Sequence, residues 1–208
     1  MFKIEKFVIG PIGTNCYVAG NQDTKECFIV DPAVFSEDVM EYIEKEGLTL
    51  KAVLLTHGHG DHIGGIEELV KRYGIPVYAH EEEKELLGDA KLNMSPSFGP
   101  AVEFTDAVYV KDMECLDIAG FHIQVLYTPG HTAGGCSYYL EKEGVVFSGD
   151  TLFWGSVGRS DFPTGNTEDL IRSIKEKLMA LPDDTIVHAG HRSETTIGYE
   201  RERNPFIK

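Results

Sequence analysis

Residues 56–62 read Thr-His-Gly-His-Gly-Asp-His, and this segment constrains the fold and chemistry of the chain more than any other. It follows the apolar run 51–55, which is rich in Val and Leu and carries no charge after Lys51. Such a run predicts a buried strand. Gly58 and Gly60, between the candidate ligands, favour tight left-handed backbone geometry that would let the imidazoles converge. The segment is therefore predicted to bind metal at the end of a buried strand.

The polar side chains of this segment divide into two groups. His57 and His59 are two residues apart, which places both on one side of an extended backbone. Asp61 and His62 are adjacent, so a tight turn can direct them toward a neighbouring point. Two such groups close together suit a hydrolytic centre with two metal ions.

Three later strand patterns each end in a short turn that contains a glycine followed directly by another possible ligand. The pairs of strand pattern and ligand are 121–127 with His131, 144–148 with Asp150, and 185–189 with His191. Ligand sites in α/β proteins gather at the edge of the sheet where strands end. We therefore expect these three side chains to join the first segment in one site.

This order of ligands resembles the signature of the metallo-β-lactamase superfamily: His-x-His-x-Asp-His, then one His, one Asp and one His. Within that superfamily, residues 158–162, 194–200 and 204–206 look like the glyoxalase II branch, and the resemblance covers nearly the whole chain. It implies an α/β protein with a metallo-β-lactamase-like four-layer αββα sandwich, as a single domain over residues 1–208. Periodicity alone predicts only one domain of mixed α and β structure.

The resemblance also implies which residues would bind each of two metal ions. These are His57, His59 and His131 for one ion, Asp61, His62 and His191 for the other, and Asp150 as a bridge together with a water or hydroxide. Asp61 could orient that hydroxide, so Asp61 and Asp150 are the expected catalytic residues. Ligands without a thiolate are compatible with zinc, iron or manganese. We expect two divalent metal ions, with zinc as the first candidate.

Asp31, which follows the strand pattern 27–30, matches a family aspartate that supports the ligands from behind. A ligating histidine usually donates its second N–H to such a carboxylate. Asp31 is equally consistent with an ordinary turn aspartate before Pro32. The remaining histidines, His80, His122 and His188, are expected to be structural or solvated.

Four residues near the ligands are candidates for substrate contact: Phe153, Trp154, Arg159 and Arg192. Arg159 stands where the glyoxalase II branch carries a basic residue near the glutathione moiety. The chain departs from that branch in two ways, of which the first weakens the case for glutathione specificity. The chain has no counterpart to the helical C-terminal domain that supplies most glutathione contacts, and Arg192 stands where many relatives carry glycine. Arg192 is expected to add positive charge at the rim of the pocket.

These residues predict a metal-dependent hydrolase of thioesters, similar to glyoxalase II, which converts an S-acylglutathione and water to an acid and a thiol. A thiolate leaving group needs little protonation, since a thiol has a pKa of about 8.5. A persulfide dioxygenase with one iron held by His57, His131 and Asp150 is an alternative, because the sequence contains every residue it needs. Further alternatives are a lactonase, a β-lactamase and a non-enzymatic metal-binding module.

Composition and charge limit the location and partners of the protein. No apolar run approaches the roughly 20 residues of a membrane span, and the N-terminus lacks the apolar region of a signal peptide. The four cysteines are scattered, as is typical of reduced thiols. We therefore expect a cytoplasmic protein without a membrane partner, for which a lactam substrate is less expected. The net charge of −15 disfavours nucleic acid, which needs basic patches, and leaves a small-molecule thioester as the expected partner.

Strand and helix patterns alternate in two similar halves. Helices are expected at 36–46, 63–73 and 167–181, with a short helix and a loop between 81 and 100. Strands are expected at 2–9, 15–19, 26–31, 51–55 and 75–79, and again at 115–119, 121–127, 136–140, 144–148 and 185–189. Two strand-rich halves with interspersed helices predict two sheets face to face, with helices outside. The oligomeric state does not follow from these patterns.

Overall fold

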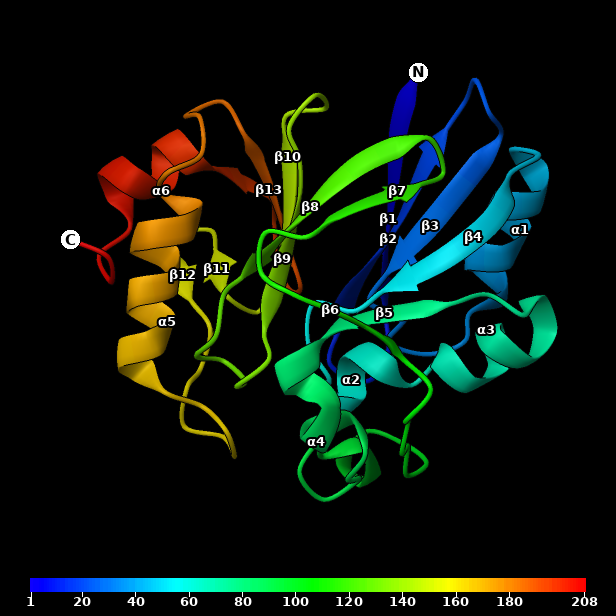
Figure 1. Ribbon diagram of the computed structural model, residues 1–208, viewed down its shortest axis with the longest axis horizontal. Helices are drawn as coiled ribbons and strands as arrows, with labels where there is room; N and C mark the ends of the chain where they lie inside the picture. Colours follow the sequence, from blue (N-terminus) through cyan, green and yellow to red (C-terminus); the bar gives the residue numbers. More distant parts are fainter.

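Two six-stranded β-sheets pack face to face, and helices cover the outer face of each sheet (Figure 1). The computed structural model describes all 208 residues. Residues 2–110 build the first sheet and residues 115–196 build the second, so each half of the chain contributes one sheet. The four-layer αββα sandwich implied by the family resemblance is confirmed.

The first sheet is antiparallel on one side and parallel on the other. Its strands, in order across the sheet, are β1 (Phe2–Ile9), β2 (Thr14–Asn21), β3 (Glu26–Val30), β4 (Thr49–Leu54), β5 (Val77–His80) and β6 (Val108–Val110). β1 to β3 pair antiparallel, whereas β3 to β6 pair parallel. Because β3 and β4 are parallel, Asp31 and His57 leave the sheet at the same edge.

The second sheet is an antiparallel meander extended by one parallel strand and a short antiparallel strand at the edge. Its strands, in order across the sheet, are β14 (Thr195–Thr196), β13 (Ile186–Ala189), β10 (Val145–Gly149), β9 (Cys136–Leu140), β8 (Phe121–Tyr127) and β7 (Cys115–Ile118). β10 and β13 are parallel, so Asp150 and His191 emerge at the same edge. A small hairpin of β11 (Leu152–Phe153) and β12 (Ser156–Val157) follows Asp150.

Helices on both outer faces complete the sandwich. They are α1 (Glu37–Lys45) and α3 (Ile66–Tyr73) on the first sheet, and α5 (Thr167–Ser173) and α6 (Ile197–Arg203) on the second (Figure 1). α1 buries Val39 and Ile43, one helical turn apart. The side chain of Asn166 caps α5 by accepting hydrogen bonds from the backbone N–H groups of Glu168 and Asp169. Shorter elements near the ligand edge are α2 (Gly60–Ile63), α4 (Lys84–Leu87) and the 3-10 turns Glu81–Glu83 and Ser95–Ser97.

Aromatic side chains fill much of the space between the two sheets. Tyr17 and Phe28 from the first sheet meet Phe147 from the second, with ring centroids 5.3 and 6.2 Å apart. All three residues are almost completely buried. Burial of large aromatic side chains contributes strongly to the free energy of folding. This layer therefore holds the two sheets, and the ligand segments at their edges, in a fixed relation.

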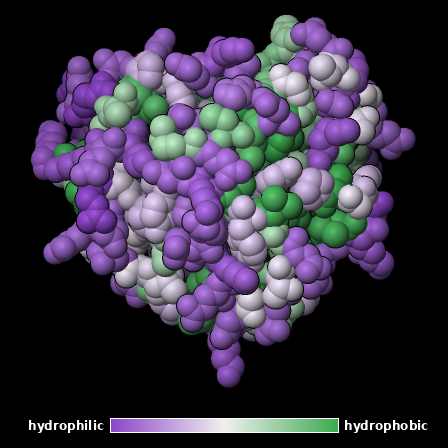
Figure 2. Space-filling view, in the orientation of Figure 1, coloured by the Kyte–Doolittle hydropathy of each residue, from purple (hydrophilic) through white to green (hydrophobic).

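Polar side chains cover most of the face of the molecule seen in Figure 2, with smaller apolar areas between them. The chain has 34 Asp and Glu residues against 19 Lys and Arg, so acidic groups predominate. No helix in the structure combines the length and the apolar character needed to cross a membrane.

The expected strands all form, with ends that differ by at most two residues. The expected helix 63–73 is divided into α2 and α3, because Gly64 and Gly65 pass close to the preceding loop. A Cβ on Gly64 would lie only 2.5 Å from the carbonyl oxygen of Ala33. The expected helix 167–181 forms as α5 and a π-helical turn over Ile174–Leu178. The sequence patterns missed β6, β11, β12, β14 and α6, which are too short to show a clear periodicity.

A hydrogen bond between the sheets suggests a test of this architecture. The buried hydroxyl of Tyr138 in β9 donates to the carbonyl oxygen of Leu55, just before the ligand segment, at 2.9 Å. Tyr138→Phe should lower the free energy of unfolding by about 1 kcal/mol, because it removes the donor and keeps the ring. Urea unfolding would measure this loss, and the exposed Tyr73→Phe is the matched control. Equal stability of the two variants would contradict the assigned role of the hydroxyl.

Candidate metal centre

Three of the predicted ligands converge at the ends of β4 and β8. His57 and His59 follow β4, and His131 follows β8. The centroids of their rings lie 4.9, 4.6 and 4.7 Å apart. Nδ1 of His59 and Nε2 of His131 face each other at 2.9 Å. One ring nitrogen from each histidine can therefore reach a common point.

A second group lies beside the first and contains Asp61, His62 and His191. Asp61 and His62 occupy the first turn of α2, and His191 follows β13. Oδ2 of Asp61 lies 3.4 Å from Nε2 of His62 and 3.2 Å from Nε2 of His191. The hydroxyl of Thr14 donates to the same carboxylate oxygen at 3.0 Å, which fixes its direction. These three side chains also offer their ligand atoms to one point.

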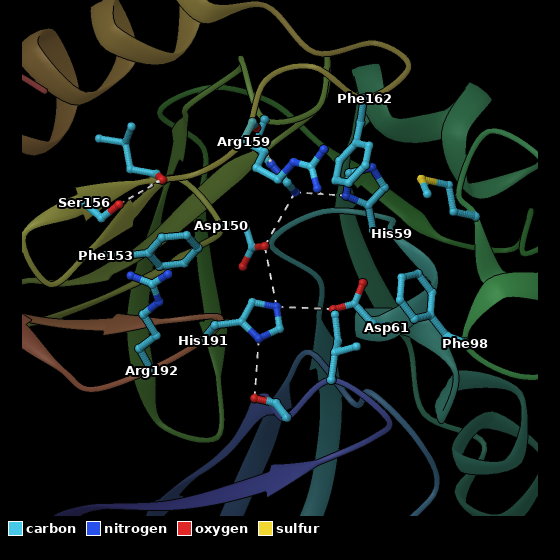
Figure 3. Close-up of a pocket in the computed structure, with 15 residues that line it drawn as sticks. His59, Asp61, Phe98, Asp150, Phe153, Ser156, Arg159, Phe162, His191 and Arg192 are labelled. Carbon is cyan, nitrogen blue, oxygen red and sulfur yellow. Dashed lines mark hydrogen bonds and ion pairs between the residues drawn. The ribbon is translucent and has the colours of Figure 1, made fainter.

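Asp150 lies between the two groups (Figure 3). Its Oδ2 is 3.6 Å from Nε2 of His131 in the first group and 3.6 Å from Nε2 of His191 in the second. Its Oδ1 is 3.6 Å from Nε2 of His62. The structure thus brings all seven predicted ligands together, with Asp150 in the position that a bridging carboxylate requires. Their binding of metal stays a prediction.

The glycines between the first ligands serve a purpose other than the one predicted. Gly58 and Gly60 do not adopt the expected left-handed geometry, since neither has a positive φ. Both are instead tightly packed. A Cβ on Gly58 would lie 2.9 Å from the side chain of Leu87, and one on Gly60 would lie 2.3 Å from the backbone of Ser95. Close approach of the segment 84–97 therefore requires these glycines.

Two other glycines allow the later ligands to reach the cluster. Gly149 has φ +50°, and a Cβ there would lie 2.1 Å from Oγ1 of Thr56. A Cβ on Gly190 would lie 2.2 Å from Oδ1 of Asp150. Any side chain at either position would push Asp150 or its neighbours out of place.

Asp31 contacts the ligands from behind, which favours the supporting role over that of an ordinary turn residue. Its Oδ2 lies 3.0 Å from Nδ1 of His62 and accepts a hydrogen bond from the Thr56 hydroxyl at 2.6 Å. Its Oδ1 accepts from the Thr56 backbone N–H at 2.8 Å. A carboxylate in this position holds the His62 ring so that Nε2 points into the cluster.

Backbone carbonyl groups orient two further histidines. Nδ1 of His131 donates to the carbonyl oxygen of Arg159 at 2.7 Å, and Nδ1 of His191 donates to that of Gly13 at 3.4 Å. Each bond leaves Nε2 free to face the cluster. Arg159 therefore contacts the site through its main chain as well as through its side chain. The main-chain contact could not be inferred from the residue type.

Glu83 is a buried carboxylate that the sequence did not single out. Its Oε1 accepts a hydrogen bond from the backbone N–H of Gly58 at 2.7 Å, and its Oε2 accepts from the hydroxyl of Thr132 at 3.1 Å. Burial raises its pKa to about 7, although these donors act against the rise. Glu83 thereby ties the segment of His57 and His59 to that of His131. This role could not be inferred from the sequence, because Glu83 belongs to the acidic run 81–83, and such runs are usually solvated.

The electrostatics of the cluster favour bound cations. Burial lowers the pKa of His57 well below its usual range, and burial together with nearby His131 lowers the pKa of His59 to about 3. Both rings are therefore neutral at pH 7, as metal ligands must be. Burial alone would lower the pKa of His62, but Asp61, Asp150 and Asp31 raise it to about 10. The same three carboxylates would favour a cation bound beside His62.

Unpaired buried atoms give an independent test of the fit to metal ions. Nε2 of His57, His59 and His62, together with Oδ1 of Asp150, have no hydrogen-bond partner within the protein, although each is buried. Unpaired buried polar atoms are costly and rare, so four in one cluster indicate a missing partner. Imidazole and carboxylate donors in two adjacent groups fit two divalent metal ions.

A cavity of about 570 Å³ opens above the cluster. Of the four predicted substrate residues, Phe153, Arg159 and Arg192 line it, whereas Trp154 does not, and contact of Trp154 with substrate stays a prediction. Trp154 lies in the turn between β11 and β12, is 54% exposed, and has its ring centroid 6.4 Å from that of Tyr199. The complete lining is Ile12, Gly13, His59, Asp61, Met94, Phe98, His131, Asp150, Phe153, Ser156, Val157, Arg159, Phe162, His191 and Arg192.

The histidines expected to lie outside the site are placed elsewhere. His80 stacks on the ring of Tyr127, with centroids 4.1 Å apart. His122 is exposed and pairs with Asp117, and His188 packs against Phe147 in the core. None of the three lines the cavity.

The αββα sandwich with this donor set at its edge defines the metallo-β-lactamase class of fold and site. The sequence model of the Metallo-beta-lactamase superfamily matches residues 9–191 of this chain. The chain belongs to this superfamily and is one of its metal-dependent hydrolases.

Relatives of similar length carry related names. The probable metallo-hydrolase YqgX of Bacillus subtilis is 43% identical over 209 residues, which cover 99% of this chain and 97% of that protein. Hydroxyacylglutathione hydrolase GloC of Haemophilus influenzae is 38% identical, covering 98% of this chain and 97% of that protein.

Solved structures agree with this assignment. The crystal structure of BLEG-1 B3 metallo-beta-lactamase superimposes with a TM-score of 0.92 at 41% identity, covering 99% of this chain and all of that one. TTHA1623 in a di-iron-bound form superimposes with a TM-score of 0.86 at 34% identity, covering 97% of this chain and 99% of that one.

The seven donors lead to a prediction of metal content. A single ion takes about four protein donors, so elemental analysis after metal repletion should give close to two divalent ions per chain. His191→Ala should reduce this toward one, because it removes a donor from the second group only. The exposed His122→Ala is the control. One tightly held metal in the wild type, with His62 and His191 replaceable at no loss, would contradict two separate sites.

The role of Glu83 can be tested through metal affinity. Glu83→Ala should weaken binding at the site of His57, His59 and His131 roughly 10- to 100-fold, as removal of an outer support typically does. Glu83→Gln should weaken it less, because its amide oxygen can still accept from Gly58. Competition with a chelator would measure both, and the exposed Glu82→Ala is the control. Unchanged affinity in a folded Glu83→Ala protein would show that the two segments are held without it.

Proposed function

We propose that the protein hydrolyses small thioesters in the manner of glyoxalase II, converting an S-acylglutathione or a related thioester and water to an acid and a thiol. The proposal is carried by one property of the cavity: apart from the predicted metal ligands, its lining contains no side chain suited to donate a proton. The metal ligands themselves support hydrolysis in general. The absence of a separate proton donor favours a thiolate over an amine as the leaving group.

The ionisable groups of the lining are the predicted ligands and two arginines, Arg159 and Arg192. Arginine does not release its proton in proteins, so neither is a general acid. Expulsion of an amine is helped by a proton, whereas a thiolate leaves readily because its thiol has a pKa of about 8.5. A cavity without a separate acid therefore suits thioesters better than amides or lactams.

Within this mechanism the chain positions water and substrate. Asp61 and Asp150 are the proposed catalytic carboxylates, because they lie at the floor of the cavity among the histidines and can accept hydrogen bonds from an attacking water. Two divalent metal ions, when bound, would lower the pKa of a water toward 7 and polarise the acyl carbonyl. Phe153, which lines the cavity, would exclude water from the far side of the substrate. Zinc is the proposed metal, and the same donors suit iron or manganese.

The name of one relative supports a thioester substrate. GloC, described above, is a hydroxyacylglutathione hydrolase, and the similarity extends over almost all of both chains. The proposed location is the cytoplasm. All four cysteines are free thiols, and three of them are buried, which suits a reducing compartment.

Hydrolysis of a lactam or lactone is the second candidate. It is favoured by the 41% identity to a B3 metallo-beta-lactamase over nearly the whole chain. A single-iron persulfide dioxygenase would need only His57, His131 and Asp150. It leaves the complete group of Asp61, His62 and His191 unexplained, which favours the hydrolase.

A substrate panel would separate these functions. The metal-loaded protein should hydrolyse S-acyl thioesters with a kcat/KM at least an order of magnitude above that for lactones and β-lactams, and it should consume no oxygen with persulfides. Asp150→Ala should lower kcat for every true substrate by orders of magnitude, because it removes the carboxylate between the two groups. Preferred turnover of a lactam, or oxygen uptake with one iron per chain, would replace the thioesterase proposal.

A further inference from the structure

The cavity contains two guanidinium groups in different situations (Figure 3). Arg159 is already paired: its Nε and Nη2 donate to the two carboxylate oxygens of Asp161 at 2.9 and 2.8 Å. Its guanidinium also lies 4.1 Å from the ring centroid of Phe162. A carboxylate that binds Arg159 must compete with Asp161 for the same guanidinium. The side chain of Arg159 is therefore a poor candidate for anion binding.

Arg192 is free by comparison. Its exposed side chain forms no ion pair and no hydrogen bond within the protein, and its guanidinium lies 6.0 Å from the ring centroid of Phe153 at the wall of the cavity. Its main chain is held in place, since its carbonyl oxygen accepts a hydrogen bond from Nδ2 of Asn15 at 2.9 Å. Arg192 is thus the unpaired positive charge of the cavity.

The backbone of Arg192 is in an unfavourable conformation. Its φ of +67° lies in the left-handed region, where a residue with a Cβ is disfavoured and glycine is not. Apart from its approach to Phe153, its side chain forms no hydrogen bond or ion pair within the protein that would offset this strain. Strain retained next to a predicted metal ligand, His191, points to a function for the side chain.

The electrostatics of the cavity indicate what that function is. The chain carries a net charge of −15, which disfavours the approach of an anion. An anionic substrate must therefore find local positive charge, and at the rim Arg192 is the group with its charge available. A planar guanidinium is well suited to a carboxylate, which it can bind through two hydrogen bonds.

We propose that Arg192 determines specificity by binding a carboxylate on the thioester substrate, remote from the bond that is cleaved. The inference rests on the proposed thioesterase function and narrows its substrate class to anionic thioesters. The carboxylate could belong to the acyl part or to the thiol part of the substrate. The folded protein gives up some stability at Arg192 in return for this selectivity.

Three matched thioesters distinguish the position of the carboxylate. They are the S-glutaryl and S-glutaramoyl esters of 3-mercaptopropionamide, and the S-glutaramoyl ester of 3-mercaptopropionate. The first carries its carboxylate on the acyl part, the second is neutral, and the third carries it on the thiol part. Steady-state kinetics of the metal-loaded wild type should show a lower KM for one of the anionic esters than for the neutral ester.

Substitutions at Arg192 then test the residue itself. Arg192→Ala should raise KM for the preferred anionic ester by roughly tenfold and leave kcat nearly unchanged, because the carboxylate is bound equally in ground and transition states. KM for the neutral ester should not change. Arg192→Lys should retain most of the preference, since it keeps the charge.

Arg192→Gly gives a second test, in which substrate binding should weaken while the stability of the protein increases. It should raise KM as Ala does, yet raise the melting temperature by roughly 1 to 4 °C, because glycine relieves the left-handed strain. Met113→Gly is the control, since Met113 has φ +61° and is 52% exposed in a turn far along the chain from the ligands. It should gain similar stability with no change in KM for any ester.

The outcomes separate this inference from the proposed function. Hydrolysis of all three esters with KM unmoved by Arg192→Ala would overturn the role of Arg192 and leave the thioesterase intact. An equal rise in KM for the neutral and anionic esters would overturn it as well, because it would indicate packing rather than charge. No hydrolysis of any of the three by the metal-loaded wild type would overturn the proposed function and this inference with it.

Discussion

The gathering of imidazoles and carboxylates in a buried cluster is the constraint on which the rest of the structure depends. His57, His62 and Asp150 direct atoms into this cluster that find no partner within the protein. Such an arrangement is unfavourable unless cations complete it, since each unpaired buried polar atom costs free energy. The two-sheet architecture makes the arrangement possible, because its strands end at a common edge and an aromatic core fixes their relative positions.

Support from outside the ligand set makes this cluster rigid. Asp31 orients His62 from the first sheet, and Glu83 joins the segments that carry His57 and His131. Both carboxylates are buried and act on segments distant in sequence. Each is stabilised by backbone or hydroxyl donors, as a buried carboxylate must be.

The cavity above the cluster combines a reactive floor with a selective rim. The floor contains the predicted metal ligands, including the two proposed catalytic carboxylates, while Phe153 and Arg192 form part of the wall. In our proposal, strain at Arg192 and the absence of an internal partner for its charge reflect a trade between stability and function at one residue. Relatives named for lactam and for thioester hydrolysis share the fold, so the rim rather than the floor separates their substrates in this proposal.

The sequence by itself determined the seven candidate ligands, because those ligands sit at fixed spacings beside strand ends and glycines. The resemblance carried by these ligands then implied the family and the sandwich. The sequence also determined the long strands, whose apolar patterns are clear. Only the tertiary structure decided which side chains act from a distance. Glu83 lay in a run that resembled solvated surface, Trp154 lies outside the lining of the cavity, and Arg159 pairs with Asp161 while Arg192 has no such partner. Those outcomes depend on contacts between segments far apart in the chain, which local patterns do not encode.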